Sequence, residues 1–389
     1  MHENRIFISL FLSIFVAMLG IGVISPIMPL YAKSLGANGF DLGLIYAAFS
    51  ISRAIFMPMA GRLSDHKGRK MFIVIGLVIY SLVSLGYIWA QSVLTMTLIR
   101  LLHGIGSAMV VPIASAVIGD MSPKGKEGQM MGNFQVALFL GFGAGPLLGG
   151  VIQDYFSSEH VFYFMGALSL LALLLIVVFV PELKTGKKLK DKEQTAFKTM
   201  WHKPVFRGLV SFRLSNAVGR AAVISFLPVF AARINMTPAK IGILVSLNIL
   251  LTSILQWIFG KAADRYDRRL LIILGNVVGA IPLLLTPMAT TFSHLVILGC
   301  LMGLGGGIAF PAAGAVATEL GRKHGMGNIM GFFNMAMSIG SIVGAMAAGQ
   351  VMDLLGMSYV FLFGGVITLI GSAASVKWLY QKEAAIDSE

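Results

Sequence analysis

Apolar residues in this chain occur in long runs, and short polar stretches separate one run from the next. A helical run of about 20 apolar residues crosses the roughly 30 Å hydrocarbon core of a bilayer. The alternating ten-residue segments that a membrane barrel needs are not found. The pattern predicts twelve transmembrane helices, at roughly 6–31, 42–60, 71–90, 94–118, 128–152, 160–181, 205–231, 239–260, 270–289, 294–318, 327–352 and 357–380.

The first run lies near the N-terminus and has to be distinguished from a cleaved targeting signal. It is longer than the core of a signal peptide, lacks a small-residue cleavage site and leads into Pro26 and Pro29. We expect it to be retained as the first span.

Composition indicates a membrane protein rather than a soluble one. Of the 389 residues, 57% are hydrophobic and 12% are charged, whereas a soluble domain carries about 25% charged residues. The expected fold class is an all-α membrane protein with twelve transmembrane helices in two six-helix, pseudo-symmetric halves.

One long polar stretch divides the twelve runs into two sets of six. We predict an N-terminal half at 1–181, a basic cytoplasmic linker at 182–204 and a C-terminal half at 205–389. The linker is rich in lysine, which is typical of a solvated segment near anionic lipid. A partner-binding segment is the alternative.

Basic residues are distributed unequally between the two sides of the predicted membrane. With the N-terminus inside, 23 of the 30 Lys and Arg residues fall on the inner side and 3 on the outer side. This asymmetry predicts that both termini are cytoplasmic. It also accounts for the net charge of +13 without a nucleic-acid partner.

The two halves contain an internal repeat at an offset of 199 residues. The offset aligns proline, glycine, aspartate and arginine positions from the first span to the end of the fifth. Examples are Pro29 with Pro228, Gly104 with Gly303, Asp65 with Asp264, Arg69 with Arg268, and Asp154 with Asp353. Two parallel repeats of six spans are typical of transporters that work by alternating access.

Two repeated loops carry candidate gating residues. The loop after span 2 runs from Gly61 to Lys70, and its mate after span 8 runs from Gly260 to Arg269. Glycines there suit a tight turn, and an aspartate suits a neighbouring helix N-terminus. Each loop also contains an arginine that can pair with an acidic residue at the inner end of a later span, span 4 for the first loop and span 10 for the second. The candidate gating residues are Gly61, Asp65, Gly68, Arg69, Asp120, Gly260, Asp264, Arg268 and Glu319, with the pairs Arg69–Asp120 and Arg268–Glu319.

The segment Gly61–Lys70 resembles the signature loop of the major facilitator superfamily, with the form G-x-L-x-D-x-x-G-R-K. The second copy departs at Asp267, where the pattern has glycine, and we expect it to be the weaker latch. The resemblance covers the whole chain and implies the major facilitator fold.

Span 5 resembles the g-x-x-x-G-P-x-x-G-G motif of the drug/proton antiporters in that superfamily, across Gly141–Gly150. Glycines at every fourth residue permit close helix packing, and Pro146 beside Gly145 permits a bend. We add Gly145 and Pro146 to the gating candidates. Span 4 contains Arg100-Leu101-Leu102-His103-Gly104, which is similar to the family's R-x-x-q-G motif. The span 5 resemblance implies export.

Four arginines lie inside spans, where an ionisable residue is a functional candidate. Acidic residues occur only in loops or at span ends. Buried cations without a buried carboxylate favour an anionic or zwitterionic cargo. For Arg213 the alternative is that it reaches to the inner interface. The candidate substrate-binding residues are Tyr46, Arg53, Arg100, Arg213, Asn216 and Arg220.

Proton coupling needs a titratable group. His103 is the candidate deep in a span, three residues from Arg100, and a polar lining role is its alternative. Asp154 and Asp353, at the outer ends of spans 5 and 11, are the alternative candidates, or they cap the outer side.

These features predict a proton-coupled antiporter that exports small amphiphilic compounds or drugs. The alternatives are a dedicated exporter or exchanger of an anionic metabolite, and a membrane receptor or scaffold without flux. We expect partners to be a small-molecule substrate, protons and the lipid bilayer, with a monomeric chain. No nucleophile triad, metal cluster or phosphate loop is evident, so we expect no enzyme activity, cofactor or metal.

Overall fold

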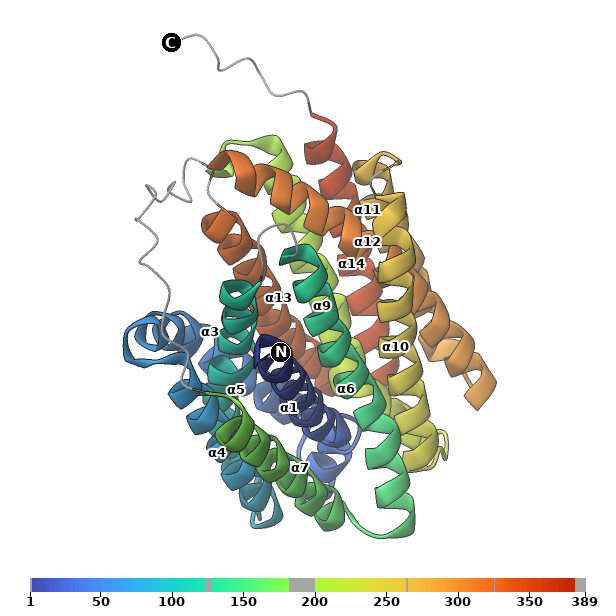
Figure 1. Ribbon diagram of the computed structural model, residues 1–389. Coiled ribbons are helices and arrows are strands. Elements are labelled where there is room, and N and C mark those ends of the chain that lie inside the picture. The colour runs from blue at the N-terminus through green and yellow to red at the C-terminus, as the bar shows by residue number, and fades with distance from the viewer. Residues whose placement is uncertain (1, 123–126, 182–199, 264, 325, 382–389) are drawn as a thin grey trace. The chain divides into compact units, whose positions relative to one another are not determined.

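A computed structural model describes residues 2–122, 127–181, 200–263, 265–324 and 326–381, and all regular elements within these ranges are helical (Figure 1). The helices of the first half are α1 (His2–Ile24), α2 (Met28–Ser34), α3 (Gly39–Lys67), α4 (Arg69–Ile88), α5 (Val93–Met121), α6 (Glu127–Tyr155) and α7 (Ser158–Phe179). Those that follow are α9 (Pro204–Arg233), α10 (Pro238–Ala262), α11 (Arg268–Leu285), the 3-10 turn η1 (Thr286–Met288), α12 (Phe292–His324), α13 (Met326–Leu355) and α14 (Met357–Leu379). Within the described ranges, twelve spans are long and apolar enough to cross a membrane.

Two predicted boundaries differ from the structure. The first span is interrupted between Ile24 and Met28, at Pro26, because proline cannot donate a backbone hydrogen bond inside a helix. The predicted loop after span 2 is mostly helical, since α3 continues to Lys67 and α4 begins at Arg69. Helices do not end where their apolar residues end, because polar residues extend a helix into the aqueous phase.

The described chain divides into two compact units. The first comprises residues 1–187 and 227–250, and the second comprises 188–226 and 251–389. In the first unit Tyr80, Val110 and Phe134 belong to one apolar core. In the second unit Phe206, Phe212 and Ala309 belong to another. The predicted linker lies largely at 182–199, outside the described residues.

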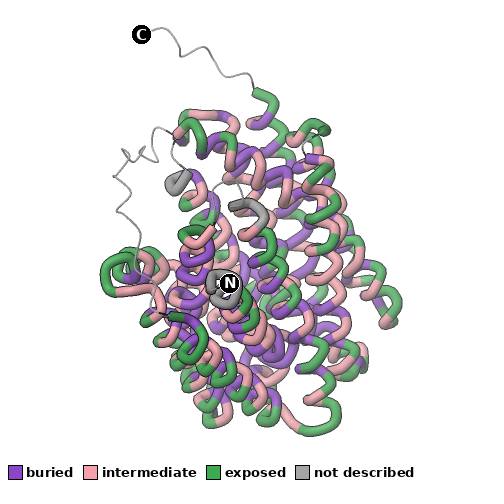
Figure 2. The backbone as a smooth tube through the Cα atoms, viewed as in Figure 1, coloured by how far each residue is buried: buried purple, intermediate pink, exposed green. Residues whose placement is uncertain are grey.

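Single helices carry both buried and exposed positions (Figure 2). Many exposed positions are apolar: Leu94, Leu174 and Ile254 expose 68%, 58% and 58% of their surface. Such exposure over many helices is unfavourable in water, and a bilayer covers it without cost. The molecule is therefore a multi-pass membrane protein.

The repeat is visible in the closest helix contacts. A methyl group added at Gly141 of α6 would meet the carbonyl oxygen of Phe15 in α1, and one added at Gly340 of α13 would meet that of Leu214 in α9. Phe15 and Leu214 are also 199 residues apart. Each half thus uses a glycine at the same place to bring the equivalent helices together.

Candidate functional site

The first unit contains a buried arginine surrounded by aromatic rings. Arg100 of α5 is 6% exposed. Its guanidinium carbon lies 5.1 Å from the ring centre of Tyr46, 5.7 Å from that of Phe49 and 5.9 Å from that of Tyr87. Its Nε has no hydrogen-bond partner among the described residues. Ring faces carry partial negative charge, so they stabilise the cation while leaving it able to receive an anion.

His103 lies one helical turn from Arg100 and is fully buried. The Tyr87 hydroxyl and His103 Nδ1 are 2.9 Å apart. The rings of Phe49 and Tyr80 meet the imidazole edge-on at 5.3 and 5.1 Å. Within the described chain, His103 Nε2 has no hydrogen-bond partner. A proton on this imidazole would place a second cation beside Arg100.

The structure therefore brings three predicted residues together, Tyr46, Arg100 and His103. Arg53 lies on α3, two turns from Tyr46, and is half-buried. Among the described residues no carboxylate forms an ion pair with Arg53 or Arg100. Sequence analysis missed Tyr80 and Tyr87, although their seven-residue spacing in an apolar run places both on one face of α4.

The arginines of the second unit share an aromatic ring. Arg213 and Arg220 of α9 place their guanidinium carbons 5.6 and 5.5 Å from the ring centre of Phe310. Arg213 also lies 4.5 Å from the ring centre of Phe333 and donates a hydrogen bond to Met337 Sδ at 2.9 Å. These contacts hold the Arg213 guanidinium against α12 and α13. Arg220 is exposed.

Asn216 has a different environment from the arginines on either side. Its Nδ2 donates to Asn276 Oδ1 of α11 at 3.1 Å. Asn276 is 1% exposed and donates in turn to Ser372 Oγ of α14 at 2.6 Å and to the Thr368 carbonyl at 3.3 Å. Asn216 thus joins a buried polar network linking α9, α11 and α14. Sequence analysis missed Asn276, a lone amide in an apolar run.

The first predicted gating pair is present. Arg69 Nη1 lies 2.6 Å from Asp120 Oδ2, and Nη2 lies 3.1 Å from Asp65 Oδ1. The Arg69 side chain is 12% exposed, so this bridge is better shielded than an ordinary surface pair. We expected Asp65 to cap a neighbouring helix. It pairs with Arg69 instead, because α3 extends past Asp65.

Glycines in this segment have different roles. Gly68 has φ +97°, a backbone conformation that favours glycine, and it alone separates α3 from α4. Gly61 and Gly260 lie inside α3 and α10, where an added methyl group would meet nothing within 4 Å. Our expectation that they form the turns was wrong, because the helices continue through them.

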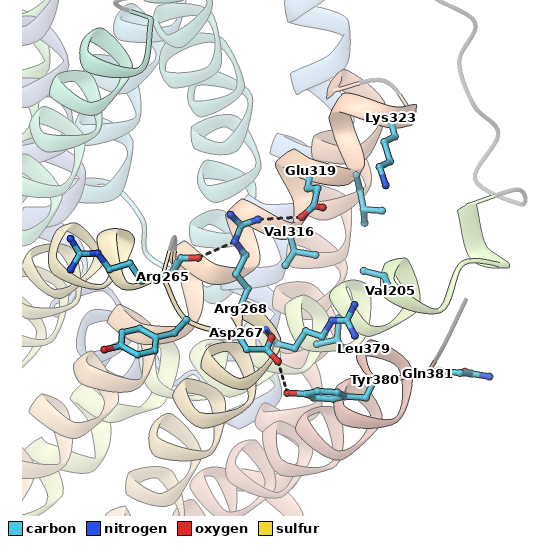
Figure 3. A pocket seen from close by; sticks show the side chains of 14 residues that line it. Val205, Arg265, Asp267, Arg268, Val316, Glu319, Lys323, Leu379, Tyr380 and Gln381 are labelled. Carbon is cyan, nitrogen blue, oxygen red and sulfur yellow. Dashed lines mark hydrogen bonds and ion pairs between the residues drawn. The ribbon is translucent and has the colours of Figure 1, made fainter. Parts of the chain in front are cut away.

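The second predicted pair is also present, with Arg268 Nη1 3.2 Å from Glu319 Oε2 (Figure 3). Arg268 Nε donates to the Ala263 carbonyl at 2.9 Å. Asp267, the departure from the signature, accepts a hydrogen bond from the Arg269 backbone at 2.8 Å and so caps α11. Asp264 lies outside the described residues.

The glycine-rich part of α6 packs against α1 and the first part of α10, all within the first unit. A methyl group at Gly145 would lie 2.6 Å from Gly22 Cα. Leu147, which follows Pro146, donates its backbone N–H to Ser246 Oγ at 2.8 Å. The proline carbonyl abuts Gly242. Pro146 therefore sits at a close contact, in a helix that continues to Tyr155.

Asp154 lies at the end of the same helix and is exposed. Its Oδ2 accepts a hydrogen bond at 3.0 Å from the backbone N–H of Ala239, in the first turn of α10. The positive end of a helix dipole stabilises a carboxylate at this position. Asp154 therefore contributes to capping the N-terminus of α10. Its role as a proton carrier stays a prediction.

Twelve apolar helices among the described residues, built as a tandem repeat with arginines inside helices and paired charges at the helix ends, define a polytopic transporter-like membrane protein. The chain belongs to the Major Facilitator Superfamily, whose family model matches residues 10–232 and 210–388. It is a multi-pass transporter of that superfamily, and the predicted fold class is confirmed.

Individual relatives cover nearly the whole chain. An uncharacterized MFS-type transporter of Methanocaldococcus jannaschii is 30% identical, over 95% of this chain and 96% of its own. Multidrug resistance protein 2 of Bacillus subtilis is 29% identical, over 99% and 98%. A solved structure of a variant of the nucleoside transporter NupG has a TM-score of 0.83 at 16% identity, over 97% and 100%. That last likeness shows the fold alone.

Proposed function

We propose that this protein exports small amphiphilic compounds, including drugs, in exchange for protons and by alternating access. The observation that carries the proposal is the cluster around Arg100, where three aromatic rings surround one buried cation. Flat apolar faces beside a single charge suit a compound with an apolar body and one polar group. The exporter-type motif in α6 and the relative named for multidrug resistance support export.

Proton-driven flux in proteoliposomes tests this proposal. Vesicles holding purified protein are given an imposed pH gradient, and uptake or loss of a fluorescent amphiphile is followed. We expect flux that reverses with the gradient and disappears when a protonophore collapses it. Flux that ignores the gradient would contradict proton antiport, and binding without flux would support a receptor or scaffold instead.

A second candidate is a dedicated exporter or exchanger of an anionic metabolite. It is favoured by the absence of any carboxylate paired with Arg53 or Arg100 among the described residues. A charged hydrogen bond in a desolvated site contributes about 1.5–3 kcal/mol. Arg100→Gln should therefore weaken transport of an anionic amphiphile by roughly ten- to hundredfold and barely affect a neutral one.

Arg322→Gln is the matched control, because Arg322 is an exposed arginine at the end of α12. It should leave both compounds unaffected. If Arg100→Gln reduces neutral and anionic transport equally, Arg100 is structural and charge selection lies elsewhere. If only anions are transported by the native protein, the dedicated exporter replaces the broader proposal.

A further inference from the structure

The second unit contains a cavity of about 770 Å³ at the ends of α9, α11, α12 and α14 that the positive-inside pattern places on the cytoplasmic side (Figure 3). None of its lining residues belongs to the aromatic cluster of the first unit. Charged groups and apolar side chains share its wall. Its lining includes Val205, Arg269, Val316, Glu319, Lys323 and Leu379.

The described lining has an excess of positive charge. It contains four basic side chains and two acidic ones. Both acids are engaged, Glu319 with Arg268 at 3.2 Å and Asp267 with the Tyr380 hydroxyl at 3.3 Å. In Figure 3 Arg265 points away from the Arg268–Glu319 pair. Arg269 and Lys323 are the remaining cations, both exposed.

The guanidinium of Arg269 lies 5.7 Å from the ring centre of Tyr380. That contact leaves its donors available, since a ring face accepts no conventional hydrogen bond. Lys323 has no ion pair with a described residue. Both side chains carry N–H donors that bind the oxygens of a phosphate group.

The apolar part of the wall distinguishes a lipid from a soluble anion. Val205, Val316 and Leu379 line the same cavity as the cations. Tyr266 and Tyr380 also line it and expose 69% and 46% of their surface, as aromatic residues do at the headgroup level of a bilayer. A soluble phosphate would use only the charged half of this wall.

We propose that this cavity binds the phosphate headgroup of an anionic phospholipid from the cytoplasmic leaflet, with Arg269 and Lys323 as its ligands. Basic pockets between transmembrane helices on this side of a membrane are suited to such headgroups. The bound lipid ties α11 and α12 together beside the Arg268–Glu319 pair and so stabilises the second unit. The inference does not depend on the transported substrate.

The test uses the full-length protein in phosphatidylcholine nanodiscs with increasing phosphatidylglycerol, and it reads the thermal unfolding midpoint. We expect the midpoint to rise and saturate with phosphatidylglycerol. Arg269→Gln/Lys323→Gln should need on the order of tenfold more of this lipid, since each basic side chain near an anionic surface contributes appreciably to lipid binding. Arg269→Lys/Lys323→Arg should recover most of the response.

Lys261→Gln/Lys377→Gln is the control, because it removes two charges from the same unit at residues that do not line the cavity. It should respond to phosphatidylglycerol like the native protein. An equal loss in both double variants would mean general surface attraction and overturn the site. In phosphatidylcholine-only discs, glycerol phosphate should give no stabilisation. If it does as well as the lipid, the ligand is a soluble anion and the lipid assignment fails.

Discussion

At the residue scale, the arginines inside helices contact ring faces, and no described carboxylate forms an ion pair with Arg100 or Arg213. Arg100 lies among Tyr46, Phe49 and Tyr87, and Arg213 lies between Phe310 and Phe333. Such contacts stabilise a desolvated cation by about 2 kcal/mol each, which is less than the desolvation penalty of several kcal/mol that one buried ion incurs. The cluster around Arg100 is therefore electropositive and suited to binding an anion.

The positive charge of this cluster distinguishes the candidate proton carriers His103 and Asp154. A protonated His103 would stand beside Arg100 and would favour joint binding of a proton and an anion, which does not suit exchange. Asp154 instead lies at the exposed end of α6, where protonation adds no second cation beside Arg100. We predict that Asp154→Asn abolishes the dependence of flux on the pH gradient. His103→Gln should retain that dependence, with altered substrate affinity.

The measurement is initial flux at several imposed pH gradients, with substrate saturating. Asp353→Asn is the control, because Asp353 is the repeat mate of Asp154 at the end of α13. It should keep the gradient dependence. Loss of dependence in His103→Gln, with Asp154→Asn unaffected, would reverse the assignment.

The sequence identified the arginines inside helices but not their neighbours. A charge inside an apolar run can be recognised from the sequence alone. The partners of Arg69 and Arg268 can be predicted as well, because each pair joins the ends of two consecutive helices. The rings around Arg100 come from α3 and α4, and their convergence depends on how those helices pack against α5. Asn276 was missed for the same reason.

At the element scale, helices approach each other closely at glycine positions, as α6 and α1 do at Gly141. At Gly141 the backbone of α6 lies against the backbone of α1. A side chain added at residue 141 would therefore collide with the Phe15 carbonyl oxygen. Gly132 is on the same helix, and a methyl group there would meet nothing within 4 Å. The same Gly→Ala substitution can therefore be compared at two positions of α6, one in contact with another helix (Gly141) and one without such a contact (Gly132).

We predict that Gly141→Ala lowers stability by about 1–3 kcal/mol, since the two backbones have to separate. Gly132→Ala should be neutral or stabilising by up to about 1 kcal/mol, because alanine favours helix over glycine. The repeat mates Gly340→Ala and Gly331→Ala should behave in the same two ways, as their surroundings match. Thermal unfolding in one detergent gives all four values.

An equal effect at Gly141 and Gly132 would show that helix propensity, and not contact, sets the response. The periodic glycines indicated close packing in advance, but not which helix each one meets. The boundaries were less predictable. The end of α3 is set by Gly68 rather than by the last apolar residue, and the first span breaks at Pro26.

At the scale of the whole molecule, the repeat and the charge asymmetry are independent predictors of topology. Residues 199 apart occupy equivalent places, and six spans separate the copies, so repeat mates should face the same aqueous phase. The excess of basic residues decides which phase that is. Ser34 and its mate Arg233 should face outward, and Lys67 and its mate Tyr266 should face inward.

We predict this result from four single-cysteine variants in a Cys300→Ser background, which removes the native thiol. A membrane-impermeant maleimide added to intact cells should label Ser34→Cys and Arg233→Cys. Lys67→Cys and Tyr266→Cys should react only after the membrane is permeabilised. If mates label on opposite sides, the two halves are not parallel repeats. If repeat mates label on the same side but the two sides are exchanged, the parallel repeat holds and the charge rule has given the wrong orientation. The lipid cavity would then lie at the outer leaflet.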